Sequence, residues 1–256
     1  MRYAFKVQYI GKNYAGSQIQ FRNGKQIETP TVQGELEKAI CTLICGKNAV
    51  NNKRPVKTVF SGRTDRGVNS LGQVVHFDTD KCIVASKFIY SLNEILPDDI
   101  SVTDLKEVQP EFHAQKSAKR RHYRFEFINR KCKNAFDGDL MRIKYEIDIE
   151  RMQDSLNYLL GEHDFSSFKS SGTLNPSKVC FIENAECRRV GDRIVIDITG
   201  NRFLYNMVRT IVGTLLEIEG HNLPSSHMKD VLDAKDRRKA GQTVSPFGLT
   251  LMEVTY

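Results

Sequence analysis

Hydrophobic residues near the start of the chain alternate with polar ones. In RYAFKVQYI, residues 2–10, the side chains of Tyr3, Phe5, Val7 and Tyr9 fall on one side of an extended backbone. Most of the polar residues fall on the other side. A period of two is typical of a strand that buries one face. The pattern therefore predicts a half-buried strand at this position.

The next regular pattern has the spacing of a helix. Thr31 is suited to cap the start of a helix, and Gly46 is suited to end it. Between them the apolar residues recur at intervals of three and four: Val32, Leu36, Ile40, Leu43 and Ile44. The sequence therefore predicts a strand, a long polar loop and then a helix.

The remaining patterns form two sets, separated by a polar stretch at 109–119. The first set adds a strand at 73–77, a helix at 87–96 and an extended segment at 100–108. The second set has strands at 122–130, 179–190, 192–200 and 248–256, and helices at 149–161 and 203–220. We expect two subdomains, residues 1–108 and residues 109–256. Antiparallel strands and amphipathic helices in each half indicate an α+β fold.

The composition favours a globular protein with a polyanionic partner. The chain has 256 residues, 40% of them hydrophobic, and 38 Lys plus Arg against 31 Asp plus Glu, a net charge of +7. This modest excess is suited to nucleic acid. The sequence has no apolar run of about 18 residues and no signal-peptide core, so we expect no membrane span and a cytoplasmic location.

Cysteine spacing and nucleotide motifs exclude several kinds of chemistry. The six cysteines form no C-x-x-C pair and no zinc spacing, so we expect reduced thiols and no metal. Cys41 and Cys45 are expected on the apolar face of the first helix. The sequence has no Gly-rich phosphate loop, no dinucleotide motif and no H-E-x-x-H motif. A mechanism driven by nucleotide or metal therefore has no support.

The main candidate for chemistry is Asp65, in the segment SGRTDRGVNSLGQVVHFD at residues 61–78. It lies between Arg63 and Arg66, with a glycine beyond each arginine. One interpretation is a surface turn held by local hydrogen bonds. The other is an ionised carboxylate in a partly dry site, balanced by Arg63 or another guanidinium and able to act as nucleophile or base. Residue spacing alone does not distinguish between these two interpretations of Asp65.

Basic residues gather around Tyr123 in KSAKRRHYRFEF, residues 116–127. Such cations can hold phosphates while the tyrosine ring stacks on a base. Protection of a strand edge, with Tyr123 in the core, is the alternative. Smaller basic groups at 51–57 and 234–241 are interpreted as solvated unless folding brings them to one side.

Arg209 lies away from the apolar stripe of the predicted helix FLYNMVRTIVGTLL, residues 203–216. One interpretation is a solvated cation. The other is that Gly213 leaves space beside the arginine for a partner carboxylate or an RNA backbone. Periodicity does not separate the two.

From end to end the chain resembles the TruA-type tRNA pseudouridine synthases. The segment SGRTDRGVNSLGQVVHF is similar to that family's G-R-T-D-x-G-V signature. Supporting matches occur in the same order: TVQGELEKAI, NEILPDDI, FHA, GEHDFSSF, GNRFLYNMVRTIVGTLLEI and GLTLMEVTY.

The resemblance implies a cofactor-free isomerase that detaches uracil from ribose, turns it and rejoins it through C5, acting on the anticodon stem-loop of tRNA. Asp65 matches the essential aspartate. Arg63 matches an arginine that contacts RNA, Tyr123 a tyrosine that packs on the uracil, and Arg209 an arginine that pairs with the aspartate. The implied architecture is two similar α+β halves with antiparallel sheets, joined across a central basic cleft, in a homodimer that binds tRNA across both subunits.

The chain departs from the family pattern at several places. YIGK at 9–12 and GSQ at 16–18 replace the usual Y-D-G-T and G-W-Q, and RGVNSL at 66–71 replaces A-G-V-H-A. The usual FHAR becomes FHAQ at 112–115. None of these changes removes a reacting group, and we expect them to affect RNA docking. The alternatives are therefore the same reaction at another tRNA site or on ribosomal RNA, and an RNA-binding protein without chemistry.

Overall fold

The computed structural model describes residues 1–22, 25–26, 28–46, 56–171 and 177–256. Most of the basic group predicted at 51–57 lies outside the described residues. The chain forms two compact units. The first comprises Met1–Ala118 together with Leu251–Tyr256, and the second comprises Lys119–Thr250. The division into subdomains at 108/109 stays a prediction.

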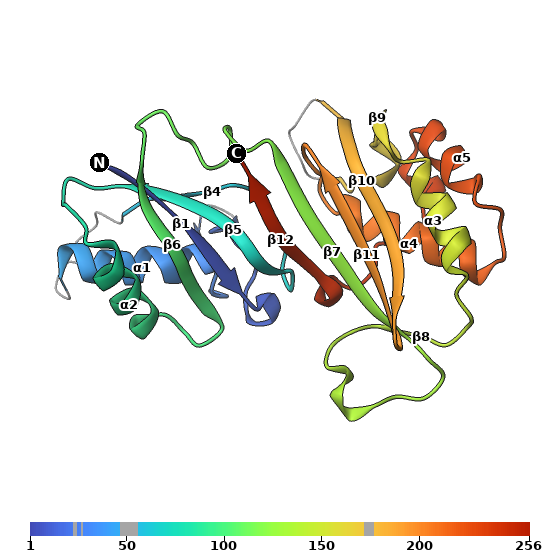
Figure 1. The fold of residues 1–256 in the computed structure, drawn as a ribbon, viewed down its shortest axis with the longest axis horizontal. Helices are drawn as coiled ribbons and strands as arrows, with labels where there is room; N and C mark the ends of the chain where they lie inside the picture. Colours follow the sequence, from blue (N-terminus) through green and yellow to red (C-terminus); the bar gives the residue numbers. More distant parts are fainter. Residues whose placement is uncertain (23–24, 27, 47–55, 172–176) are drawn as a thin grey trace. The chain divides into compact units, whose positions relative to one another are not determined.

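The first unit is built on strands in the order β6-β1-β5-β12 (Figure 1). β1 pairs antiparallel with both β5 and β6. β12 runs in the same direction as β5, because Leu251 lies at Ser70 and Met252 lies at Gly72. Their bounds are β1 Arg2–Tyr9, β5 Asn69–Asp78, β6 Ile100–Val108 and β12 Leu249–Thr255. A short strand, β4 Thr58–Phe60, pairs with β5, and the hairpin of β2 Phe21–Arg22 and β3 Lys25–Gln26 forms a separate small sheet. The strand predicted at 73–77 is longer than expected, because it begins at Asn69.

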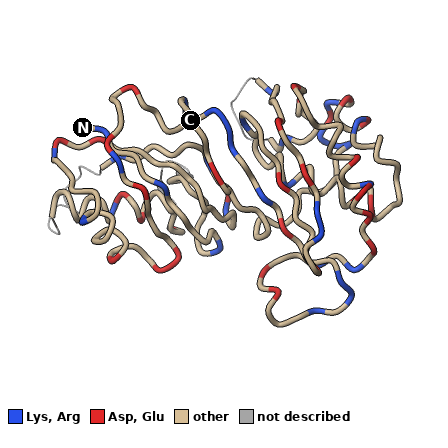
Figure 2. The backbone as a smooth tube through the Cα atoms, in the orientation of Figure 1, with Lys and Arg blue, Asp and Glu red and all other residues tan. Residues whose placement is uncertain are grey.

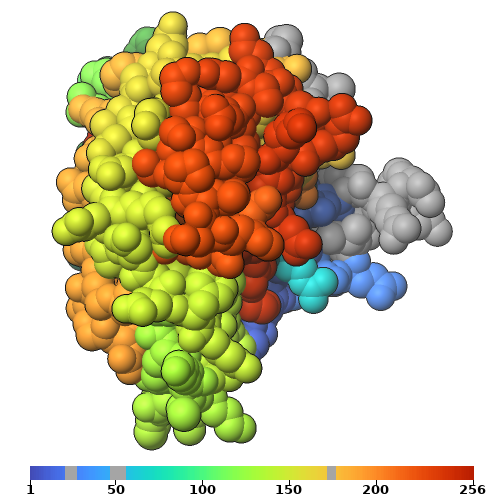
Figure 3. Space-filling view, turned by 90° about the vertical axis from the view of Figure 1, so that its right-hand side faces the viewer, coloured from blue at the N-terminus to red at the C-terminus, as the bar shows by residue number. Residues whose placement is uncertain are grey.

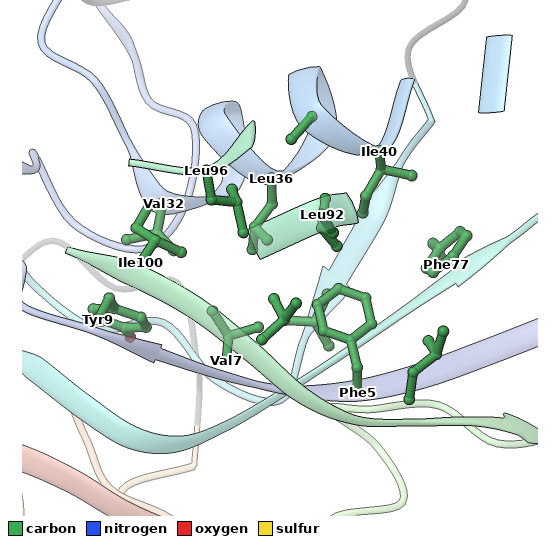
Figure 4. Packing of buried hydrophobic residues seen from close by; sticks show 14 of the residues in the cluster. Phe5, Val7, Tyr9, Val32, Leu36, Ile40, Phe77, Leu92, Leu96 and Ile100 are labelled. Carbon is green, nitrogen blue, oxygen red and sulfur yellow. The ribbon is translucent and has the colours of Figure 1, made fainter. Parts of the chain in front are cut away.

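Two helices, α1 Val32–Cys45 and α2 Ala85–Ile95, pack on this sheet. The Thr31 hydroxyl accepts a hydrogen bond from the Gly34 amide at 3.1 Å, which confirms the predicted cap. The predicted apolar residues of α1 and the alternating aromatics of β1 meet in one core (Figure 4). Cys41 is buried, whereas Cys45 is exposed. The prediction for Cys45 was wrong, because Ile44 takes the buried position at the end of the helix.

The second unit has strands in the order β7-β11-β10-β9, all antiparallel to their neighbours in that order. Their bounds are β7 Arg120–Asn129, β9 Gly161–Asp164, β10 Val179–Val190 and β11 Arg193–Gly200. The two-residue strand β8 Arg142–Ile143 pairs with the end of β7 in parallel. This arrangement and that of the first unit confirm the predicted α+β fold.

Three helices cover one face of the second sheet (Figure 1). They are α3 Ile149–Asn157, α4 Met207–Gly220 and α5 His227–Ala234. Phe125, Phe127 and Ile196 point into the core beneath them and are almost completely buried. Helix α4 begins four residues later than predicted, because Asn206 has a left-handed backbone (φ +63°) that stops the helix from extending toward its N-terminus.

Candidate active site

Asp65 lies in the loop that joins β4 to β5 in the first unit. The two strands pair antiparallel, with Phe60 opposite Val75, so the loop reverses the chain over residues 61–68. Thr64 is buried, Asp65 is half-buried, and Arg63 is exposed. An isolated β-bridge joins Asp65 to Gly16. The loop is therefore attached to a second segment of the chain, which excludes a free surface turn.

Thr64, the residue before Asp65, forms hydrogen bonds through its amide, its carbonyl and its hydroxyl. The Thr64 amide donates to the Ser17 hydroxyl oxygen at 2.8 Å, and the Thr64 carbonyl accepts from the Ser17 amide at 3.1 Å. The hydroxyls of Thr64 and Tyr9 share a hydrogen bond of 2.7 Å. Burial raises the pKa of Tyr9, so this hydroxyl keeps its proton. Since all three residues are buried, these bonds fix the backbone at Asp65.

Gly11 and Gly67 anchor the other side of Asp65. The Gly67 amide donates to the Gly11 carbonyl at 3.2 Å, and the Gly11 amide donates to the Asn69 side chain at 2.9 Å. A Cβ atom on Gly11 would lie 2.1 Å from the carbonyl oxygen of Val68, so only glycine fits there. Gly67 has φ +81°, a conformation that glycine adopts without strain.

A buried glutamine supports the loop from within the sheet. Gln73 is 0% exposed, and its amide nitrogen donates to the Gly62 carbonyl at 3.0 Å. Its amide oxygen accepts from the Ser61 hydroxyl. The sequence interpretation overlooked Gln73 and the supporting roles of Tyr9 and Ser17. A polar amide at the start of the apolar run QVVHF was the available signal.

In the second unit, Tyr123 lies on β7 opposite Ile198 of β11. Its ring is half-buried and packs edge-on against Phe203, with centroids 5.1 Å apart and planes at 81°. Such a T-shaped contact is a favourable geometry for aromatic rings. Phe203 thus fixes the orientation of the tyrosine without covering it completely.

Arg209 belongs to the first turn of α4 and is half-buried, so the interpretation as a solvated cation was wrong. Its Nε donates to the carbonyl of Val244 at 2.8 Å, and its Nη1 donates to the Asn206 side chain at 2.8 Å. The space predicted beside Gly213 is filled by the chain itself. A Cβ atom on Gly213 would lie 1.7 Å from the carbonyl oxygen of Gln242. Gly213 therefore packs closely against the backbone of Gln242, and a partner of Arg209 has to approach the guanidinium from another side.

The basic cluster around Tyr123 is partly neutralised by its own neighbours. Arg124 makes two hydrogen bonds, of 2.9 and 3.2 Å, with Asp197, which lies opposite it on β11. Arg120 forms an ion pair of 2.6 Å with Glu183. Lys116 and Lys119 remain exposed. Of the predicted phosphate ligands, Arg124 is therefore the least available, because its charge is already balanced.

Asp197 is the buried centre of this cluster, since only 8% of its side chain is exposed. Burial alone would raise its pKa, but hydrogen bonds from Arg124, Arg188 and His122 outweigh burial and lower the pKa below the usual value. Asp197 is thus an ionised structural residue at neutral pH.

Asp65 belongs to the first unit, and Tyr123 and Arg209 belong to the second. The meeting of these three side chains, the contact of Arg63 with RNA and the basic cleft between the halves stay predictions. Among the described residues, no group of three or more His, Cys, Asp or Glu side chains could hold a metal ion, and no helix is long and apolar enough to span a membrane.

Comparison with known proteins identifies the family. A family model described as tRNA pseudouridine synthase matches residues 155–256. A tRNA pseudouridine synthase A of Caldicellulosiruptor saccharolyticus is 41% identical over 251 residues, covering 98% of this chain and 97% of the relative. Proteins with the same name in Shouchella clausii and Colwellia psychrerythraea are 40% and 38% identical, covering 100% of this chain and 93% and 94% of those relatives.

An identity of about 40% over the full length, together with the family model, settles the class. The chain belongs to the tRNA pseudouridine synthase family, which confirms the resemblance drawn from its motifs. It is therefore an isomerase of the pseudouridine synthase type.

Proposed function

We propose that this protein converts uridine to pseudouridine in the anticodon stem-loop of tRNA, with Asp65 as the catalytic carboxylate. The observation that carries the proposal is the fixed, half-buried position of Asp65 in a chain about 40% identical to proteins named tRNA pseudouridine synthase A. A carboxylate held in this way can attack C1′ of the ribose or remove the 2′ proton.

The other predicted residues have roles that suit their surroundings. Tyr123, held edge-on by Phe203, packs on the flipped uracil and relays the C5 proton. Arg209, oriented by Val244 and Asn206, pairs with Asp65 and keeps it ionised. Arg63 contacts the RNA and helps to expose the target base, which costs a few kcal/mol of unstacking.

Release of tritium tests the reaction. The protein is incubated with tRNA that carries uridine tritiated at C5, beside Asp65→Asn and the matched control Asp80→Asn, a change at an exposed aspartate of the same unit. We expect release by the wild type and by the control, and none by Asp65→Asn. If the wild type releases no tritium from tRNA, the proposal is wrong.

Mapping pseudouridine in the product tests which tRNA position is modified. We expect pseudouridine in the anticodon stem-loop, and loss of the product when the uridines of that stem-loop are replaced by cytidine. Modification at another tRNA site, or only of ribosomal RNA, would contradict the assignment while leaving the isomerase intact.

We further propose a cytoplasmic homodimer, for which light scattering should give twice the chain mass of 29.2 kDa.

A further inference from the structure

The connection between β7 and α3 displays an aromatic ring to solvent. We call residues 130–144 the Phe136 loop. It projects beyond the end of the second unit's sheet (Figures 1 and 3). Phe136, near its tip, is 92% exposed. Folding gains almost nothing from this ring, because the hydrophobic effect depends on area removed from water.

Hydrogen bonds order the tip of this loop on both sides of the Phe136 ring. The Phe136 amide donates to the Asn134 side chain at 3.0 Å, and the Asn134 amide donates to the Asp137 carboxylate at 2.9 Å. Arg130 forms ion pairs with Asp137 and, at 2.8 Å, with Asp192 on the neighbouring turn. These bonds fix the backbone at Phe136, so little ordering entropy remains to be lost when a partner binds the ring.

The charge of the loop favours an anionic partner. Within residues 130–144 there are five lysines and arginines and two aspartates: Arg130, Lys131, Lys133, Arg142, Lys144, Asp137 and Asp139. Lys131, Lys133 and Lys144 are exposed, and the loop is predominantly basic (Figure 2). An exposed ring beside exposed cations matches unpaired nucleotides, since bases stack on aromatic rings while phosphates bind cations.

We propose that the Phe136 loop is a second RNA-binding site, in which Phe136 stacks on an unpaired base and Lys131 and Lys133 bind the adjacent phosphates. The proposal rests on the proposed function, because tRNA supplies the nucleotides. Asn129, at the base of the loop, is six residue steps along β7 from Tyr123, a distance of ~20 Å along a strand. The loop therefore contacts tRNA away from the nucleotide that reacts.

Binding of unmodified full-length tRNA tests the proposal, measured in the Asp65→Asn background so that no turnover occurs. We expect Phe136→Leu, which keeps an apolar side chain but removes the ring, to weaken binding about tenfold. Phe136→Tyr should bind as tightly as the parent. The matched control is Tyr90→Ala, which removes an aromatic ring that is 68% exposed on α2.

The salt dependence tests the cations. Replacing Lys131 and Lys133 with alanine should reduce the slope of log K against log salt by roughly 1.4–1.8. Equal tRNA affinity and salt slope in the parent and in all loop variants would overturn the proposal. So would a change of oligomeric mass in Phe136→Leu with unchanged tRNA binding, which would assign the ring to a protein contact. Failure of the proposed function is distinguishable, because the wild type would then release no tritium.

Discussion

The hydroxyl oxygen of Ser17 accepts a hydrogen bond of 2.8 Å from the backbone amide of Thr64, the residue next to Asp65. Ser17 is completely buried and belongs to the GSQ segment at residues 16–18. In this chain Ser17 supports the loop that carries the Asp65 carboxylate. A change at Ser17 should therefore act on the catalytic step.

Ser17→Ala should lower both stability and turnover. The Thr64 amide would lose its acceptor in a buried place, which costs about 1–3 kcal/mol. Urea unfolding measures this loss, and single-turnover kinetics should show a slower chemical step with unchanged affinity for tRNA. Ser101→Ala is the matched control, because its hydroxyl makes a long hydrogen bond of 3.4 Å with Gln8. Wild-type stability and rate in Ser17→Ala would contradict the supporting role.

Substitutions of Tyr123 should separate packing from proton transfer. Tyr123→Phe keeps a ring that can pack on Phe203 and on the target base, so tRNA binding should be retained while tritium release slows. Tyr123→Ala should lose both tRNA binding and tritium release. Filter binding and tritium release measure the two quantities. Full release by Tyr123→Phe would exclude the hydroxyl as the relay for the C5 proton.

Gly213→Ala should destabilise the protein although alanine favours helices. Helix propensity alone predicts a gain of about 1 kcal/mol. The new methyl group would, however, lie 1.7 Å from the Gln242 carbonyl, so the backbone at 241–244 would have to move. Arg209 would then lose its acceptor at Val244. Thermal unfolding should show a lower Tm. In Gly220→Ala, at the end of the same helix, the nearest atoms belong to the Tyr145 side chain at 3.4 Å, and Tm should stay near the wild-type value or rise.

Asp197→Asn should destabilise the second unit by about 3 kcal/mol at neutral pH, because it leaves Arg124 and Arg188 without their shared carboxylate. Asp233→Asn, in an exposed pair with Lys229, should leave the unfolding midpoint unchanged.

The effect of Asp197 should disappear in acid. Its pKa is lower in the folded protein than the unfolded value of about 3.9, so its contribution is fully present above that pH. The contribution is lost as the pH falls through the folded pKa. Urea unfolding of wild type and Asp197→Asn from pH 7 to pH 2 should therefore converge in acid. A difference that stays constant with pH would contradict an ionic role.

Segments with a clear period were predictable, and short or polar ones were not. The strand at Arg2–Tyr9 and the helix at Val32–Cys45 follow directly from apolar spacing and a cap. The helix His227–Ala234 and the strands Thr58–Phe60 and Gly161–Asp164 were overlooked, because segments of three to eight residues carry too few apolar positions to define a period.

The candidate site also contains one part that the sequence revealed and another that it did not. Asp65 and its neighbours were visible as a motif. The contacts that hold them were not, since Ser17 and Thr64 are 47 residues apart and Arg124 and Asp197 are 73 residues apart. Such pairs depend on loop packing and strand register, which sequence spacing does not encode. Only the fold shows that Arg124 is neutralised and that Gly213 contacts backbone.

From Leu251 onward, the strand β12 belongs to the first unit and lies beside β5, where the Ser70 hydroxyl donates to the Leu251 carbonyl at 3.4 Å. Residues 251–256 leave the ribosome only after the whole second unit has been translated. The sheet that carries the Asp65 loop therefore cannot be completed during synthesis of its own half. A nascent chain halted before Leu251 would expose the edge of β5, and this protein should acquire its reactive geometry only once translation has passed that point.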